Sequence, residues 1–284
     1  MSSPKNILSI QSEVVTGHVG NAAARFALQR LGHEAWGVPT VILSSHAGHA
    51  GFAGEATSPA LLRKLLEALS TQGRLAIADG VLTGYLGSAE QAPVVAEAVA
   101  RTKAFDRTTL YCMDPAFGDD GRVYARPGVA EAMAEKLLPL ADIVTPNAFE
   151  LSVLSGIEVT GAESAERAIE KLGRPLVVAK SVPHRGQLGA LVLIAGTPWL
   201  AATPVVKDPP RGAGDLFAAL FFGQYVRGAL TAQALDLATR GIYHVLAASA
   251  GQPEMRLIEE QAALAAPPTP QAYRFGPLES TAHA

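Results

Sequence analysis

Short apolar runs alternate with longer helix-like segments along most of the chain. Strand-like runs, bounded by glycine, proline or polar residues, occupy 6–10, 35–43, 75–79, 109–113, 142–145, 176–180 and 189–194. A helical spacing of apolar residues predicts helices over 19–31, 61–69, 89–101, 127–138 and 216–226. Strands separated by helices indicate a three-layer α/β fold with a mostly parallel central sheet. We expect residues 1–284 to form one such domain, with a peripheral, proline-containing tail from about residue 265.

Polar residues recur where the predicted strands end. In an open α/β sheet the carboxyl ends of parallel strands share one edge, and ligands bind at that edge. The residues placed there are Ser12, His46, Asp114, Thr145, Asn147, Glu150 and Lys180. Asn147 also stands where it can cap the helix that begins after Pro146. We interpret this edge of the sheet as the binding site.

A turn at 209–215 precedes the apolar helix predicted over 216–226. Pro209 and Pro210 end any helix or strand that precedes them. Gly212 and Gly214 permit backbone angles that other residues resist. Free N–H groups at a helix N-terminus suit a phosphate or a developing anion. Asp215 then has two interpretations: a general base that takes the proton of an attacking hydroxyl, or a cap of the helix.

The remaining charged residues of this edge also have two interpretations each. Asp114 and Glu150 could hold Mg²⁺ directly or through waters, or could be a helix cap and a solvated loop residue. Lys180 could contact a phosphate or extend to the surface. The sequence has no Walker motif and no Gly-x-Gly-x-x-Gly after a strand, which disfavours P-loop and dinucleotide-binding proteins. His46 and His49 lack a cysteine or carboxylate cluster, so we expect no metal site at these histidines.

Composition and charge narrow the class of partner. A net charge of −3 and an isoelectric point near 6.2 supply no basic field for nucleic acid. Cys112 is the single cysteine, so no internal disulfide can form and a reducing compartment fits best. The first residues lead directly into a strand-like run, and no apolar stretch is long enough to cross a bilayer. We expect a cytoplasmic protein without nucleic-acid or membrane partners.

Several motifs in combination resemble known kinases. Residues 211–217, Arg-Gly-Ala-Gly-Asp-Leu-Phe, resemble the G-x-G-D signature of the ribokinase-like small-molecule kinases. Asp-Pro-Ala-Phe-Gly-Asp at 114–119 and Thr-Pro-Asn-Ala-Phe-Glu at 145–150 resemble motifs of the vitamin-kinase branch of that family. Residues 10–21 and 84–90 are similar to pyridoxal kinases, and the order of motifs holds from about Asn6 to Leu257.

This resemblance implies a ribokinase-like fold and a Mg·ATP-dependent kinase that phosphorylates the 5′-hydroxymethyl group of pyridoxal, and of pyridoxine and pyridoxamine as well. It implies a homodimer, and it leaves open a monovalent-cation requirement. The base would be Asp215, and the anion hole would be formed by Gly212, Ala213 and Gly214. The vitamin pocket would contain Ser12, Val19, His46, Ala47, Gly48, Tyr85 and Asp215. Around ATP and Mg²⁺ would lie Asp114, Thr145, Asn147, Glu150, Lys180, Arg211, Gly212 and Gly214, with Asp114 and Glu150 holding the metal.

The chain departs from the family pattern at 44–49. Ser-Ser-His-Ala-Gly-His replaces the usual Ser-Asn-His-Thr-Gln/Gly-Tyr, with the loss of a hydroxyl at Ala47 and of an aromatic ring at His49. Two other functions stay open on sequence alone. One is a hydroxymethylpyrimidine kinase of thiamine synthesis, against which the 17–21 stretch argues. The other is a non-catalytic sensor of vitamin or nucleotide, against which the retention of Asp215 and both glycines argues.

Overall fold

A ten-stranded mixed sheet runs through residues 3–278, the part of the chain that the computed structural model describes. The strands span Asn6–Val14 (β1), Glu34–Leu43 (β2), Gly54–Ala56 (β3), Gly80–Thr83 (β4), Leu110–Met113 (β5), Ile143–Val144 (β8), Leu176–His184 (β9), Gln187–Ile194 (β10), Thr197–Pro204 (β11) and Arg274–Pro277 (β12). Their order is β12-β11-β10-β9-β8-β5-β4-β1-β2-β3. The pairings from β9 to β2 are parallel, and the pairings outside them are antiparallel. A separate short hairpin joins β6 (Gly118–Asp119) to β7 (Arg122–Val123).

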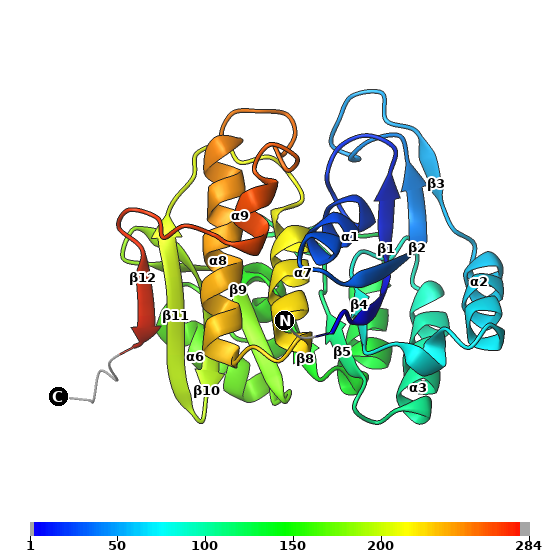
Figure 1. The fold of residues 1–284 in the computed structure, drawn as a ribbon. Coiled ribbons are helices and arrows are strands. Elements are labelled where there is room, and N and C mark those ends of the chain that lie inside the picture. The colour runs from blue at the N-terminus through cyan, green and yellow to red at the C-terminus, as the bar shows by residue number, and fades with distance from the viewer. Residues whose placement is uncertain (1–2, 279–284) are drawn as a thin grey trace.

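Helices cover both faces of this sheet. They span Asn21–Arg30 (α1), Pro59–Thr71 (α2), Gln91–Phe105 (α3), Val129–Ala132 (α4), Ala148–Ser155 (α5), Ala162–Leu172 (α6), Ala213–Val226 (α7), Thr231–Ala248 (α8) and Gln261–Ala265 (α9). One face packs against α1, α7 and α8, and separate apolar clusters join the other face to α2, α3 and α4 and to α5 and α6. Figure 1 shows α7 in front of the middle of the sheet, between α1 and α8. The predicted three-layer, mostly parallel α/β fold is confirmed. No helix within 3–278 combines the length and apolarity needed to cross a membrane.

The strand predicted over 75–79 is wrong. Leu75–Ile77 forms a 3₁₀ turn instead, and the strand follows it as β4. Leu75 is buried whereas Ile77 is 51% exposed, so this apolar run faces two environments. Gly80, which makes the true strand look like a loop in the sequence, is required by packing, because a Cβ there would lie 2.7 Å from the Phe222 ring. The helices α6 and α8 and the strand β11 are not among the elements predicted from the sequence.

The described part of the tail after residue 265 is held in place by contacts with the sheet and with α8. Arg274–Pro277 pairs with β11 as the outermost strand of the sheet. The hydroxyl of Tyr273 donates a hydrogen bond of 2.8 Å to Asp236 Oδ1 of α8. Residues 279–284 lie outside the described part. The tail therefore adds an edge strand to the domain.

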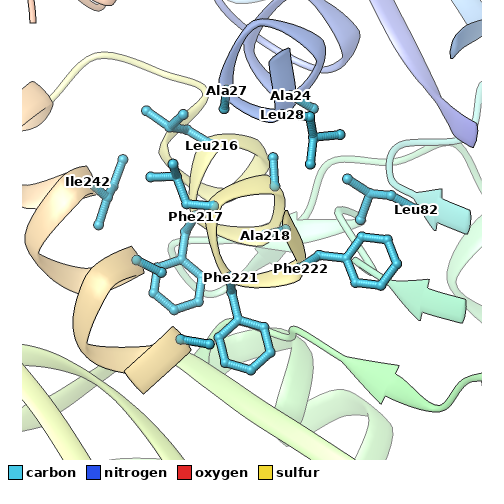
Figure 2. Close-up of a cluster of buried hydrophobic side chains, with 14 of the residues drawn as sticks. Ala24, Ala27, Leu28, Leu82, Leu216, Phe217, Ala218, Phe221, Phe222 and Ile242 are labelled. Atoms are coloured by element: carbon cyan, nitrogen blue, oxygen red, sulfur yellow. The ribbon is translucent and has the colours of Figure 1, made fainter. Parts of the chain in front are cut away.

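The helix α7 is apolar on all sides, and its surroundings explain why. Every residue from Leu216 to Gln224 is buried, between α1, α8 and the sheet. Figure 2 shows Phe217, Phe221 and Phe222 pointing away from the α7 axis toward the neighbouring elements. A helix that is hydrophobic all round is stable only inside a protein. This burial fixes the position of the helix N-terminus, where Gly212 and Asp215 lie.

Replacement of Phe222 by alanine should remove a large part of this packing. Phe222 is fully buried, so we expect Phe222→Ala to lower the free energy of unfolding by about 3–5 kcal/mol, measured by urea denaturation. Phe105 at the end of α3 is 54% exposed and provides the control, with an expected loss below about 1 kcal/mol for Phe105→Ala. Equal losses in the two variants would contradict the role assigned to α7.

Candidate functional site

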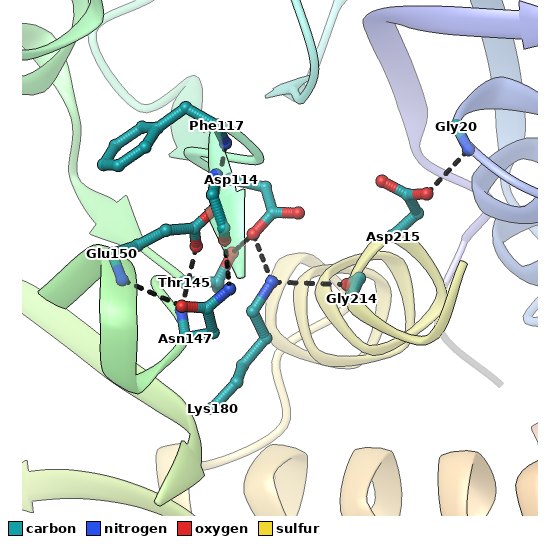
Figure 3. A network of polar contacts seen from close by, with 10 residues as sticks. Gly20, Asp114, Phe117, Thr145, Asn147, Glu150, Lys180, Gly214 and Asp215 are labelled. Atoms are coloured by element: carbon teal, nitrogen blue, oxygen red, sulfur yellow. Dashed lines mark hydrogen bonds and ion pairs between the residues drawn. The ribbon is translucent and has the colours of Figure 1, made fainter. Parts of the chain in front are cut away.

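The predicted strand-end residues meet at one edge of the sheet. Asp114 follows β5 and Thr145 follows β8. Lys180 lies in β9, just after the residues that pair with the parallel strand β8. The N-terminus of α7 adjoins them through a contact of 3.5 Å between Lys180 Nζ and Gly214 O. Figure 3 shows Lys180 between the Asp114 group on one side and the α7 turn on the other. The structure therefore brings Asp114, Thr145 and Lys180 together with the turn before α7.

Lys180 is buried and paired at the centre of the cluster. Its ammonium lies 2.5 Å from Asp114 Oδ1, which also accepts a hydrogen bond of 2.7 Å from the Thr145 hydroxyl. The exposed fractions of the Lys180 and Asp114 side chains are 8% and 3%. Burial disfavours the charged form of Lys180, but Asp114, Glu150 and Asp215 outweigh it and raise the pKa of Lys180. The lysine therefore stays charged inside the site, and the surface-lysine interpretation is wrong.

Asn147 and Glu150 form the capping box of α5. Asn147 Oδ1 accepts the Glu150 N–H at 2.8 Å, and Glu150 Oε2 accepts the Asn147 N–H at 2.9 Å, which confirms the predicted cap. Ala116 has a φ of 46°, and after this turn the Phe117 N–H donates to Glu150 Oε1 at 2.9 Å. Burial raises the pKa of Glu150 to about 7, with Lys180 opposing and Asp114 adding to the effect. Glu150 is thus a structural residue that is also poised to change its charge near neutral pH.

Asp215 faces a distant loop rather than its own helix. It lies in the first turn of α7, but that helix has no side-chain cap, and Asp215 Oδ2 accepts the Gly20 N–H at 2.8 Å. The helix-cap interpretation of Asp215 is therefore wrong. Burial raises the pKa of this half-buried carboxyl to about 6; repulsion from Asp114 adds to the rise, and the Gly20 N–H and Lys180 oppose it. Such a group can exchange a proton near neutral pH, as a general base must.

The two glycines of the turn are explained by different physical constraints. Gly212 has a φ of 97°, and a Cβ there would collide with His18 O. Gly214 has no such backbone strain, and a Cβ there would lie 3.3 Å from Lys180 Nζ. Gly212 is therefore required by the turn itself, whereas Gly214 leaves room beside the buried lysine. Ala213 between them is the first residue of α7.

Two residues predicted to bind the vitamin adjoin the Asp215 side of the cluster. Ser12 is buried in β1, and its Oγ lies directly against Gly20, the residue whose N–H binds Asp215. Val19 is buried, and its Cγ1 lies 3.1 Å from the position that a Gly212 Cβ would take. The structure thus brings Ser12, Val19 and Asp215 together around the loop that follows β1.

The other predicted pocket residues lie farther out. Tyr85 is half-buried and stacks on Tyr124, with ring centroids 6.4 Å apart. Burial lowers the pKa of His46, and the nearby charge of Arg211 lowers it further. Ala47 and Gly48 are exposed in the same loop, and the Gly48 N–H donates a hydrogen bond of 3.0 Å to His46 Nδ1. Arg211 is exposed and lies 3.6 Å from Asp120 of the β6–β7 turn.

Sequence reasoning missed Gly20 and Tyr124. Gly20 donates to Asp215, but its contribution is a backbone N–H, which carries no sequence signal beyond the glycine itself. Tyr124 follows β7; although the residue as a whole is 51% exposed, desolvation of its hydroxyl and the charges of Glu150, Asp215, Asp114 and Asp119 raise its pKa. An aromatic residue shortly after the Asp119–Gly121 turn was a visible signal, but only the fold places its hydroxyl near these carboxylates.

Comparison with known proteins agrees with this geometry. The family model described as phosphomethylpyrimidine kinase matches residues 27–256. A pyridoxal kinase PdxY of Rubrobacter xylanophilus is 40% identical over 274 residues, covering 93% of this chain and 94% of that protein. A second, from Deinococcus radiodurans, is 41% identical over 257 residues and 86% of both chains.

Solved structures give the same result. The pyridoxal kinase of Leishmania donovani in complex with ADP and pyridoxamine superposes with a TM-score of 0.89 at 30% identity, over 97% of this chain and 100% of that one. Its complex with ADP and pyridoxine gives the same TM-score and identity over 96% and 99%. The chain therefore belongs to the pyridoxal kinase family of ribokinase-like small-molecule kinases.

Proposed function

We propose that this protein transfers the γ-phosphoryl group of ATP to the 5′-hydroxymethyl group of pyridoxal, and of pyridoxine and pyridoxamine. The observation that carries the proposal is the placement of Asp215, with its pKa raised to about 6, at the N-terminus of the buried helix α7. The relatives named pyridoxal kinase, and the neighbour complexes with ADP and B6 vitamers, support the choice of substrates.

In this mechanism Asp215 is the general base. Its Oδ2 is held by the Gly20 N–H, which orients the carboxylate toward the loop after β1. As the substrate hydroxyl attacks the γ-phosphorus, its O–H bond breaks and the proton passes to Asp215, while the bond from the γ-phosphorus to the bridging oxygen breaks and ADP leaves. Ser12 and Val19, which adjoin the same loop, would hold the vitamin ring beside the base.

The turn before α7 and Lys180 would stabilise the transferred group. The N–H groups of Gly212, Ala213 and Gly214 belong to the N-terminal end of a 14-residue helix, where free donors and the helix dipole favour negative charge. Lys180 adds a full positive charge within 3.5 Å of Gly214 O. Thr145 and Asn147, which flank Lys180, would border the nucleotide together with exposed Arg211.

The carboxylates fit a Mg²⁺ that also binds nucleotide phosphates. Within 3–278 no group of three or more His, Cys, Asp or Glu side chains could hold a metal by itself. Mg²⁺ in kinases, however, takes one or two carboxylates, waters and substrate phosphates. Asp114 would be the direct ligand, and Glu150, whose two oxygens already accept backbone N–H groups, would act through water. The ion would neutralise phosphate charge during transfer.

The remaining pocket residues would contact the vitamin from the loop side. His46 and Tyr85 would line the ring, and Ala47 and Gly48 would complete the loop, in which Ala47 lacks the hydroxyl usual in the family. The homodimer is implied by the family resemblance alone, which leaves a monovalent-cation requirement open.

Hydroxymethylpyrimidine is the second candidate substrate, because the matching family model is described as phosphomethylpyrimidine kinase and so also points to a pyrimidine. A coupled assay with ATP and a panel of pyridoxal, pyridoxine, pyridoxamine and hydroxymethylpyrimidine tests both candidates. We expect the highest kcat/KM with a B6 vitamer. A preference for hydroxymethylpyrimidine would contradict the proposed pyridoxal kinase activity. The absence of turnover with every substrate would favour the non-catalytic sensor of vitamin or nucleotide.

The substitution Asp215→Asn separates the base from a structural role. Asparagine keeps the size and can still accept the Gly20 N–H, but it cannot take a proton at neutral pH. We expect kcat to fall by about 10²–10⁴-fold, with vitamin binding and Tm nearly unchanged. In the wild type, kcat/KM should fall as the pH drops through about 6, because the carboxyl then becomes protonated. Turnover of Asp215→Asn at the wild-type rate would remove the assignment.

Removal of the carboxylate charges should weaken the metal–nucleotide site. We expect Asp114→Asn and Glu150→Gln to raise the Mg²⁺ or ATP concentration for half-maximal rate by about 10–100-fold, with a smaller change in the KM for pyridoxal. Kinetics with ATP and Mg²⁺ varied separately measure this. Glu135→Gln, on an exposed side chain, is the control. A change confined to the KM for pyridoxal would show that the carboxylate was misplaced.

A further inference from the structure

The segment after α8 packs against the loops of the proposed active site. We call residues 254–257 the buttress segment and residues 44–53 the substrate loop. Met255 and Leu257 of the buttress segment are buried in the core. The fully buried Ser249 fixes its course, since Ser249 Oγ accepts the Arg256 N–H at 2.9 Å and donates to Val245 O at 2.5 Å. The buttress segment is therefore a fixed support at the end of α8.

Glu254 projects from this support toward two loops. Its Oε1 lies 3.5 Å from His49 Nδ1 of the substrate loop, and the two side chains are only 33% and 35% exposed. Its carboxylate also lies against Gly17, where a Cβ would be 2.5 Å from Oε2. The missing side chain at Gly17, in the loop that follows β1, thus makes room for Glu254.

The ring of His49 in turn contacts the ring of His46. The two rings meet edge to face, with centroids 6.0 Å apart. His46 Nδ1 accepts the Gly48 N–H at 3.0 Å, so a neutral His46 carries its proton on Nε2. The rest of the loop is tied at its ends, by the Thr16 N–H to Ser44 O at 3.0 Å and the Ala53 N–H to Ser44 Oγ at 2.9 Å. Glu254 therefore links the middle of the loop to a fixed core segment.

The neighbouring residue reaches the anion-binding turn. Met255 Cε lies 2.9 Å from the position that a Gly212 Cβ would take. Consecutive residues of one segment thus touch the substrate loop and the turn that carries Asp215. A displacement of the buttress segment would move both parts of the site relative to each other.

We propose that Glu254 is a positioning residue. Through His49 it holds the substrate loop in a fixed position relative to the α7 turn, and so determines how well the vitamin binds. This role rests on the proposed function, which places the vitamin under the loop. A partly exposed contact between a histidine and a carboxylate adds little to global stability, so the effect should be on loop order and on substrate binding rather than on Tm.

A double-mutant cycle tests the pair. His49→Ala and Glu254→Ala should each raise the KM for pyridoxal by about 3–10-fold with kcat and the KM for ATP unchanged, and the double variant should be no worse than the worse single variant. Glu254→Gln should resemble Glu254→Ala if the charge matters. Glu259→Ala is the matched control, because Glu259 pairs with Arg256 on the surface at 3.7 Å.

Hydrogen exchange of the ligand-free protein gives a second readout that needs no activity. The amides of 44–53 should exchange faster in both single variants and at the wild-type rate in Glu259→Ala. Unchanged exchange in the single variants, or effects on KM that multiply independently, would overturn the role of Glu254. A wild-type protein that phosphorylates no vitamer would refute the proposed function instead, and the exchange experiment would still decide whether Glu254 holds the loop.

Discussion

The burial of α7 on all sides is the constraint on which the site depends. Phe217, Phe221 and Phe222 of this helix pack in the apolar cluster shared with α1 and α8. This packing fixes the position of the helix N-terminus relative to the sheet. Gly80 and Gly212 show how tight the fit is, because a side chain at either would collide with a neighbour. Asp215 and the free N–H groups of the turn are placed by this core rather than by the loop that precedes them.

Charge balance is the second constraint. Three carboxyl groups, those of Asp114, Glu150 and Asp215, surround the single buried ammonium of Lys180. Burial raises the pKa values of Glu150 and Asp215 to about 7 and about 6, and repulsion from Asp114 adds to both rises. An added divalent cation would relieve this repulsion, which is a physical reason for the site to take up Mg²⁺ together with a nucleotide.

The residues proposed to bind the vitamin have different surroundings from those proposed to bind the nucleotide. Asp114, Glu150 and Lys180 are buried and held by backbone hydrogen bonds or by one another, whereas His46, Ala47 and Gly48 lie in a partly exposed loop. Rigid strand ends suit the positioning of phosphates, and a loop can adapt to a ring. Differences in substrate preference between relatives are therefore expected in the loop rather than in the strand ends.

The sequence by itself determined the alternation of strands and helices, the Asn147–Glu150 cap and the set of polar residues at the strand ends, because these depend on local periodicity and on residues close in the chain. Only the tertiary structure decided that Asp215 contacts Gly20, that Lys180 is buried against Asp114, and that 75–79 is a turn before a strand. The partners in these pairs lie 195 and 66 residues apart, and their energies depend on burial and on neighbouring charges. No local pattern carries that information, since burial and long-range contacts are created only when the sheet and α7 pack together.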